Sequence, residues 1–105
     1  MTQSFSAAVE AFLQKLVQQI EDLAPEIEAD LVDSVLTLQL PDGSMVILNR
    51  QEAVSQIWLA CSDGPARFDR DPEGPWRDPR SDATLQEHLS GILSRRLGRP
   101  ITLED

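Results

Sequence analysis

Cysteine and histidine are nearly absent from this 105-residue chain, which contains one of each, Cys61 and His88. A single cysteine excludes an intramolecular disulfide, which fits a reducing cytosol. It also excludes a CxxC pair, and nothing in the sequence arranges Ser, Asp and His as a catalytic triad. A Gly-rich phosphate-binding loop is missing as well. These absences leave no motif for nucleophilic catalysis or phosphate binding.

Long apolar runs are missing too. No stretch approaches the roughly 18 consecutive apolar residues of a membrane-spanning helix. The first residues, MTQSFSAAVEAF, lack the basic start and long apolar core of a signal peptide, and they lack the arginines of an organellar transit peptide. We therefore expect a cytoplasmic protein without a membrane partner.

Positive charge is scarce in the first part of the chain. Residues 1–42 contain eight acidic side chains and one base, Lys15, whereas residues 43–105 contain ten acids and eight arginines. The formal net charge of −9 therefore lies mostly in the first part. Acidic surfaces repel phosphate, which argues against nucleic acid and favours cations or a basic protein surface as partners. The alternative is that these acids only keep a small protein soluble.

The chain length and an ordinary composition, with 41% hydrophobic residues, predict a single domain over residues 1–105. Apolar residues at helical spacing predict a first helix over about residues 4–23, which Pro25 ends. Its expected apolar stripe consists of Phe5, Val9, Phe12, Leu13, Leu16, Val17, Ile20 and Leu23.

The middle of the chain alternates between apolar and polar residues, as half-buried strands do. Residues 26–31 predict a first strand, and Asp33 with Ser34 a turn into a second strand that contains Leu36, Leu38 and Leu40. After a turn at 41–44, further strands are expected at roughly 45–50, 55–61 and 65–70, with a short edge strand at Trp76 and Arg77.

A second helix is expected near the end of the chain. Its buried stripe consists of Leu85, Leu89, Ile92, Leu93 and Leu97. Ser81 or Thr84 is the expected cap, the latter with Glu87 three residues on, and Gly98 is the expected end. Ile101 and Leu103 of the tail are expected to pack against both helices. The predicted fold class is α+β: a two-layer sandwich with two helices on one face of an antiparallel sheet of about five to six strands.

Carboxylates gather where the first helix ends and the first strand begins. Side chains two apart along a strand lie about 6–7 Å from one another on one face, so neighbouring carboxylates there would gain from a shared cation. They are hard oxygen ligands that suit iron, manganese, magnesium or calcium. The candidate metal ligands are Glu21, Asp22, Glu26, Glu28 and Asp30. The alternative is a solvated acidic face.

A tryptophan is expected on the open face of the sheet, because the alternation of the 55–61 strand turns it away from the core. An exposed tryptophan among polar side chains is typical of a recognition patch. The candidate partner-binding residues are Asn49, Gln51, Gln56, Trp58 and Arg67. The alternative is a Trp58 half-buried by its cross-strand neighbours, with Arg67 stacked on its ring.

Three motifs in this region occur in a fixed order: Asn49-Arg50-Gln51, Gln56-Ile57-Trp58-Leu59 and Gly64-Pro65-Ala66-Arg67-Phe68-Asp69. Together they resemble the signature of the frataxin family, whose bacterial members are called CyaY. The resemblance extends from Phe5 to about Gly98 and implies the frataxin-like fold. It also implies that the five residues of the patch contact partner proteins.

The resemblance further implies weak binding of ferrous and ferric iron (Fe2+/Fe3+) on an acidic ridge. Glu26-x-Glu28-x-Asp30 is similar to the family's acidic first strand, and Glu21-Asp22 to its acidic pair near the helix end. Val17-Gln18 stands where bacterial members often have two more acids. We therefore expect fewer or weaker iron sites than in a typical member.

As a function, the resemblance implies a role in iron–sulfur cluster assembly, as an iron-dependent regulator or iron donor and not as a conventional enzyme. The implied partners are cysteine desulfurase, through its basic surface, and the scaffold protein; the implied state is a monomer, with iron-driven oligomers as an alternative. A competing hypothesis is a metal-independent interaction module that uses the exposed sheet face. Ferroxidase activity is a third hypothesis, which the lack of a His-rich site argues against.

Overall fold

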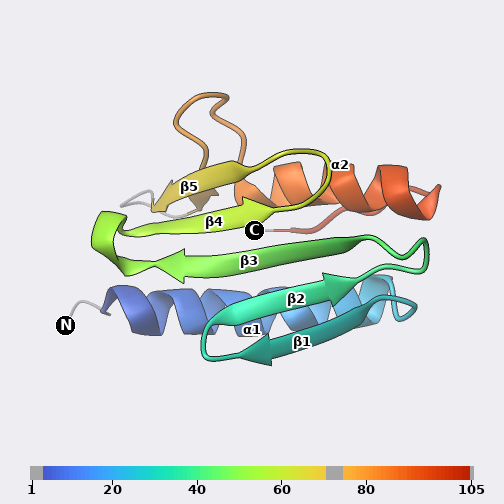
Figure 1. The fold of residues 1–105 in the computed structure, drawn as a ribbon, viewed down its shortest axis with the longest axis horizontal. Coiled ribbons are helices and arrows are strands. Elements are labelled where there is room, and N and C mark those ends of the chain that lie inside the picture. The colour runs from blue at the N-terminus through green and yellow to red at the C-terminus, as the bar shows by residue number, and fades with distance from the viewer. Residues whose placement is uncertain (1–3, 71–74, 105) are drawn as a thin grey trace.

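A computed structural model describes residues 4–70 and 75–104 of the chain. In this part, one α-helix precedes a run of consecutive strands and a second α-helix follows it (Figure 1). The elements are α1 (Phe5–Leu23), β1 (Glu28–Val32), β2 (Val35–Gln39), β3 (Met45–Gln51), a 3-10 turn η1 (Glu52–Val54), β4 (Gln56–Ala60), β5 (Ala66–Arg70), β6 (Trp76–Arg77) and α2 (Leu85–Leu97).

The strands form one six-stranded sheet in the order β1-β2-β3-β4-β5-β6, and every neighbouring pair is antiparallel. Figure 1 shows both helices behind this sheet, on the same side. The expected α+β sandwich is confirmed, with β1 and β6 as the two edge strands. No helix within the described ranges is long and apolar enough to cross a bilayer.

Helix α1 begins as the sequence predicts. The Ser4 hydroxyl accepts a hydrogen bond from the backbone N–H of Ala7 at 3.2 Å, which satisfies one of the first free donors of the helix. The helix ends before Pro25, and its buried residues follow the predicted stripe. Leu23 is an exception, because it lies in the last turn with 41% of its surface exposed.

Strand β1 begins two residues later than the alternation predicts. The backbone N–H of Ile27 bonds to the carbonyl of Ala24 at 3.0 Å, which closes a turn after α1. Glu26 lies in this turn, and the first residue that pairs with β2 is Glu28, opposite Gln39. The strand assignment of residues 26 and 27 is therefore wrong. The bounds of β3, β4 and β5 agree with the prediction to within one residue.

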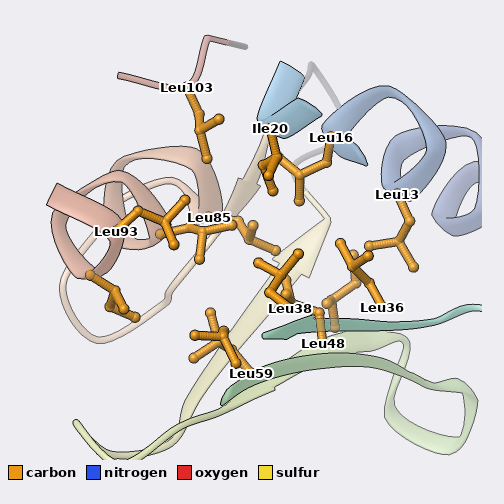
Figure 2. Packing of buried hydrophobic residues seen from close by; sticks show 14 of the residues in the cluster. Leu13, Leu16, Ile20, Leu36, Leu38, Leu48, Leu59, Leu85, Leu93 and Leu103 are labelled. Atoms are coloured by element: carbon orange, nitrogen blue, oxygen red, sulfur yellow. The ribbon is translucent and has the colours of Figure 1, made fainter. Parts of the chain in front are cut away.

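The core fills the space between the sheet and the helices. Figure 2 shows Leu38, Leu48 and Leu59 of the sheet pointing toward side chains of both helices. Fully buried positions on the helices include Leu13 of α1 and Leu85 of α2. Each such leucine contributes about 1.5–3 kcal/mol through its burial. The inward alternation of β2, β3 and β4 thus fixes which side chains face the other, open side of the sheet.

The tail after α2 packs between the two helices, as predicted. Ile101 and Leu103 are buried, and Figure 2 shows Leu103 between side chains of α1 and α2. The Ser94 hydroxyl bonds both the N–H and the carbonyl of Ile101, at 2.9 and 3.1 Å. Ser90 Oγ accepts from the N–H of Leu103 at 2.8 Å, and the Gln19 amide bonds both backbone groups of residue 104. The tail is therefore attached to both helices by polar and apolar contacts.

Thr84, and not Ser81, caps helix α2. Its hydroxyl accepts a hydrogen bond from the N–H of Glu87 at 3.1 Å, and the Glu87 carboxylate accepts one from the N–H of Thr84 at 2.8 Å. These bonds to Thr84, the backbone one first, hold the pKa of the Glu87 carboxyl below its ordinary value of 4.5. At the other end, Gly98 adopts a φ of 69°, a left-handed conformation that favours glycine.

This cap predicts a particular dependence of stability on pH. The pKa of Glu87 is lower in the folded state than in the unfolded state. The ionised carboxylate therefore contributes fully to stability above the unfolded pKa near 4.5, and this contribution is lost as the pH falls through the folded pKa. We expect Glu87→Gln to lower the melting temperature at pH 7 and to flatten its decline below pH 4.5. Thermal unfolding followed by circular dichroism between pH 2.5 and 7 measures both. Glu52→Gln removes the same charge from an exposed side chain of η1 and is the control; equal pH profiles for the two variants would exclude the cap effect.

Candidate functional site

Two of the five predicted metal ligands lie together on the open face of edge strand β1. Glu28 and Asp30 are exposed and stand opposite Gln39 and Thr37 of β2. These four side chains line one shallow depression, together with Ala29. The alternation of β1, with Ala29 and Leu31 turned inward, places both carboxylates on the solvent side. This part of the predicted row forms as the sequence indicates.

Glu26 is separated from that pair by its own ion pair. Arg99 Nη2 donates to both carboxylate oxygens of Glu26 at 2.9 Å and also to the carbonyl of Leu23 at 3.1 Å. The hydrogen bond from Arg99 is the main reason that the pKa of Glu26 lies below its ordinary value. Because a guanidinium already engages both oxygens, Glu26 is a poor candidate for a metal ligand in this conformation.

Glu21 and Asp22 are both exposed in the last turn of α1. The predicted row is thus divided into a helix-end pair, an ion-paired Glu26 and a strand pair. Across residues 4–70 and 75–104, no three His, Cys, Asp or Glu side chains are close enough to hold one metal ion. Exposed oxygen pairs of this kind suit a hard cation that keeps most of its water, and they do not form a closed coordination shell.

The predicted partner-binding residues do come together on the open face. In the sheet register Asn49 lies opposite Trp58, which in turn lies opposite Arg67. The guanidinium carbon of Arg67 lies 4.8 Å from the centroid of the Trp58 ring, which is a cation–π contact. Trp58 is half-buried. The stacked geometry that the sequence leaves as an alternative is therefore present, and it presents one joined Trp–Arg surface to solvent.

Hydrogen bonds connect these side chains to one another and to Asp69. Trp58 Nε1 donates to Gln56 Oε1 at 2.8 Å, and Gln56 Nε2 donates to Asp69 Oδ1 at 2.8 Å. Gln51 Nε2 donates to Asn49 Oδ1 at 3.0 Å. Bonds of this kind hold the tryptophan in one orientation, so a partner meets a preorganised surface. Asp69 belongs to this network and was not among the predicted residues.

Two valines extend this surface toward β1. Val32 and Val35 are 55% and 38% exposed, and the register places them in one row with Asn49, Trp58 and Arg67 across five strands. We call these five side chains the Trp58 row. Strand alternation predicts that both valines face outward, but only the antiparallel register shows that they continue the row. Sequence reasoning missed them for that reason.

Comparison with known proteins identifies the family. The family model described as Frataxin-like domain matches residues 1–99. An iron-sulfur cluster assembly protein CyaY of Thioalkalivibrio sulfidiphilus is 41% identical over 103 residues, which cover 95% of this chain and 96% of that protein. The chain belongs to the frataxin-like family. This membership confirms the resemblance carried by the three motifs between Asn49 and Asp69.

Other frataxin-like proteins agree with this assignment. A CyaY protein of the same description from Tolumonas auensis is 36% identical over 99 residues, with 94% of each chain covered. The solved structure of the frataxin from Psychromonas ingrahamii has a TM-score of 0.88 and 26% sequence identity, and the match covers 96% of this chain and 95% of that one. The two-layer arrangement described above is thus the frataxin fold.

Proposed function

We propose that this frataxin-like protein takes part in iron–sulfur cluster assembly in the cytoplasm, as an iron-dependent regulator or iron donor that contacts cysteine desulfurase and the scaffold protein. The exposed carboxylates of Glu28 and Asp30 and the adjoining Trp58 row lie on one sheet, and this arrangement is the main support for the role. Membership of the family and the description of its relatives as iron-sulfur cluster assembly proteins support the same role.

Iron is the proposed cargo of the acidic surface. Glu28 and Asp30 on β1 and Glu21 and Asp22 on α1 offer hard oxygen donors that suit Fe2+ and Fe3+. The bound ion keeps water ligands, because the carboxylates are exposed and occur in pairs. Binding is therefore weak, and the protein acts by binding and release and not as a ferroxidase. The protein is monomeric without iron, and bridging of carboxylates from different copies by iron is the proposed route to oligomers.

Docking is the proposed role of the sheet face. The negative charge of the β1 edge steers the protein toward a basic surface, and the Trp58 row then supplies the close contact. Arg67 stacked on Trp58 and the Gln56–Asp69 hydrogen bond give this contact a fixed shape. Iron on Glu28 and Asp30 reduces the negative charge beside the row, which couples iron loading to the partner encounter.

A titration with ferrous iron under anaerobic conditions, followed by NMR of the labelled protein, tests the iron site. We expect broadening and shifts confined to residues 18–33, and we expect Glu28→Gln combined with Asp30→Asn to abolish those on β1 while those near Glu21 persist. Glu52→Gln removes an exposed acid of η1, outside α1 and β1, and is the control. Unchanged spectra throughout residues 18–33 would contradict the proposal.

A metal-independent interaction module is the second candidate function. It is favoured by the absence, within the described part of the chain, of a preformed cluster of three ligands. In the same NMR experiment, this alternative predicts no response to ferrous iron and shifts at Asn49 and Trp58 on addition of cysteine desulfurase. Shifts in both regions, each with its own ligand, favour the iron-dependent function.

A further inference from the structure

A pocket on the helix side of the protein belongs to none of the surfaces described so far. It lies between α1, the beginning of β6 and the first turn of α2, and its apolar wall includes Phe12, Leu16 and Trp76. Its volume is about 240 Å³. The Phe12 and Trp76 rings lie 6.1 Å apart at 55°, so two aromatic faces border the space. Lys15, Gln19, Pro75 and Glu104 also line it.

One residue of the pocket wall carries a polar atom that the fold does not satisfy. Gln86 lines it from the first turn of α2 and is only 5% exposed. Its Oε1 is a buried side-chain oxygen without a hydrogen-bond partner, and it is the only such side-chain atom among the described residues. Buried polar atoms are nearly always paired in folded proteins, because an unpaired acceptor has lost its bonds to water. An unpaired amide in an aromatic-lined pocket therefore points to a ligand that supplies the missing donor.

We propose that this pocket binds a small neutral heteroaromatic molecule that carries a ring N–H. The size fits, because an engineered cavity of about 150 Å³ holds benzene, so that a volume of about 240 Å³ has room for a bicyclic ring. The ring packs against Phe12 and Trp76, and its N–H donates to Gln86 Oε1. The terminal torsion of glutamine is broad, so a rotation about it turns the buried oxygen toward the ligand.

The site is separate from the surfaces used in the proposed function. Trp76 faces the helices, whereas Trp58 faces the open side of the sheet. Ligand binding therefore leaves the Trp58 row and the carboxylates of β1 free. Ligand binding in this pocket does not depend on whether the protein binds iron.

Indole and 1-benzofuran test this site, because the two rings have nearly the same shape and only indole has an N–H. Each is titrated into the full-length labelled protein and followed by NMR, in which the Nε1–H signals of Trp58 and Trp76 are separate reporters. We expect saturable shifts of Trp76 and of the Gln86 amide, no shift of Trp58, and an indole affinity about tenfold higher. Weak or equal affinities of the two probes, or shifts centred on Trp58, would overturn the proposal.

Gln86→Leu provides the matched variant. It removes the unpaired oxygen and keeps a side chain of similar size, so we expect a melting temperature that is no lower than that of the unchanged protein. Indole and 1-benzofuran should then bind this variant equally. Trp58→Phe should leave the preference for indole unchanged. A Gln86→Leu variant that still prefers indole would show that another group binds the ligand.

Discussion

Replacing Ile101 and Leu103 together by serine should lower the melting temperature by more than 15 °C. Both side chains are buried between α1 and α2, and truncation of one such residue costs about 2–5 kcal/mol. A domain of this size has a total stability of about 5–15 kcal/mol, and 1 kcal/mol corresponds to about 4–8 °C. Differential scanning calorimetry measures the change.

Thr102→Ser is the matched control for that variant, because Thr102 lies between the two residues and is exposed. Its melting temperature should stay within 2–3 °C of the unchanged protein, since exposed substitutions alter stability by only about 0.5 kcal/mol. Ser94→Ala should give an intermediate loss, because it removes both hydrogen bonds to Ile101. If the double variant has the same melting temperature as the Thr102→Ser control, the tail does not contribute to the folded core.

Trp58→Ala should weaken binding to cysteine desulfurase by about 30-fold or more. A central aromatic side chain in an interface contributes about 2 kcal/mol or more, and about 1.4 kcal/mol is a factor of ten in affinity. Trp58 lies between Asn49 and Arg67 in the row and contacts Arg67 through its ring and Gln56 through its Nε1. Isothermal titration calorimetry with purified desulfurase gives the two affinities directly.

Three further variants show whether the whole row acts as the docking surface. Trp58→Phe keeps a ring under Arg67 but loses the hydrogen bond to Gln56, so we expect a smaller loss than with alanine. Val35→Asp places a charge in the row and should weaken binding. Val54→Ala changes an exposed side chain of η1 outside the row and is the control. If Trp58→Ala and Val54→Ala bind with the same affinity, the docking surface lies elsewhere.

Local sequence patterns were sufficient to predict most of the fold. Helical spacing from Phe5 to Ile20 and the Thr84–Glu87 pair place both helices, because these signals act within one or two turns. Alternation around Leu38, Leu48 and Leu59 identifies the inward face of the sheet, and hence the outward direction of Trp58. The motifs between Asn49 and Asp69 then identify the family.

Contacts between distant residues account for what the sequence did not reveal. Glu26 is removed from the acidic row by Arg99, which lies 73 positions away in the chain. Arg96 similarly connects Asp42 and Asp63, on two different loops, through ion pairs at 3.6 and 2.7 Å. No spacing rule predicts such pairs, because they depend on how α2 lies across the sheet. The unpaired oxygen of Gln86 is visible only in the packed structure for the same reason.

We expect the exposed carboxylates of α1 and β1 to act together with the Trp58 row in docking on cysteine desulfurase. A variant with Glu21, Asp22, Glu28 and Asp30 all replaced by lysine separates the two surfaces, and its binding is measured by titration calorimetry at low and at physiological salt. Glu52→Lys reverses an exposed acid of η1, outside α1 and β1, and serves as a control for nonspecific effects of charge. The four-fold reversal should abolish binding while the control retains it. Unchanged affinity of the reversed variant would show that these carboxylates play no part in docking.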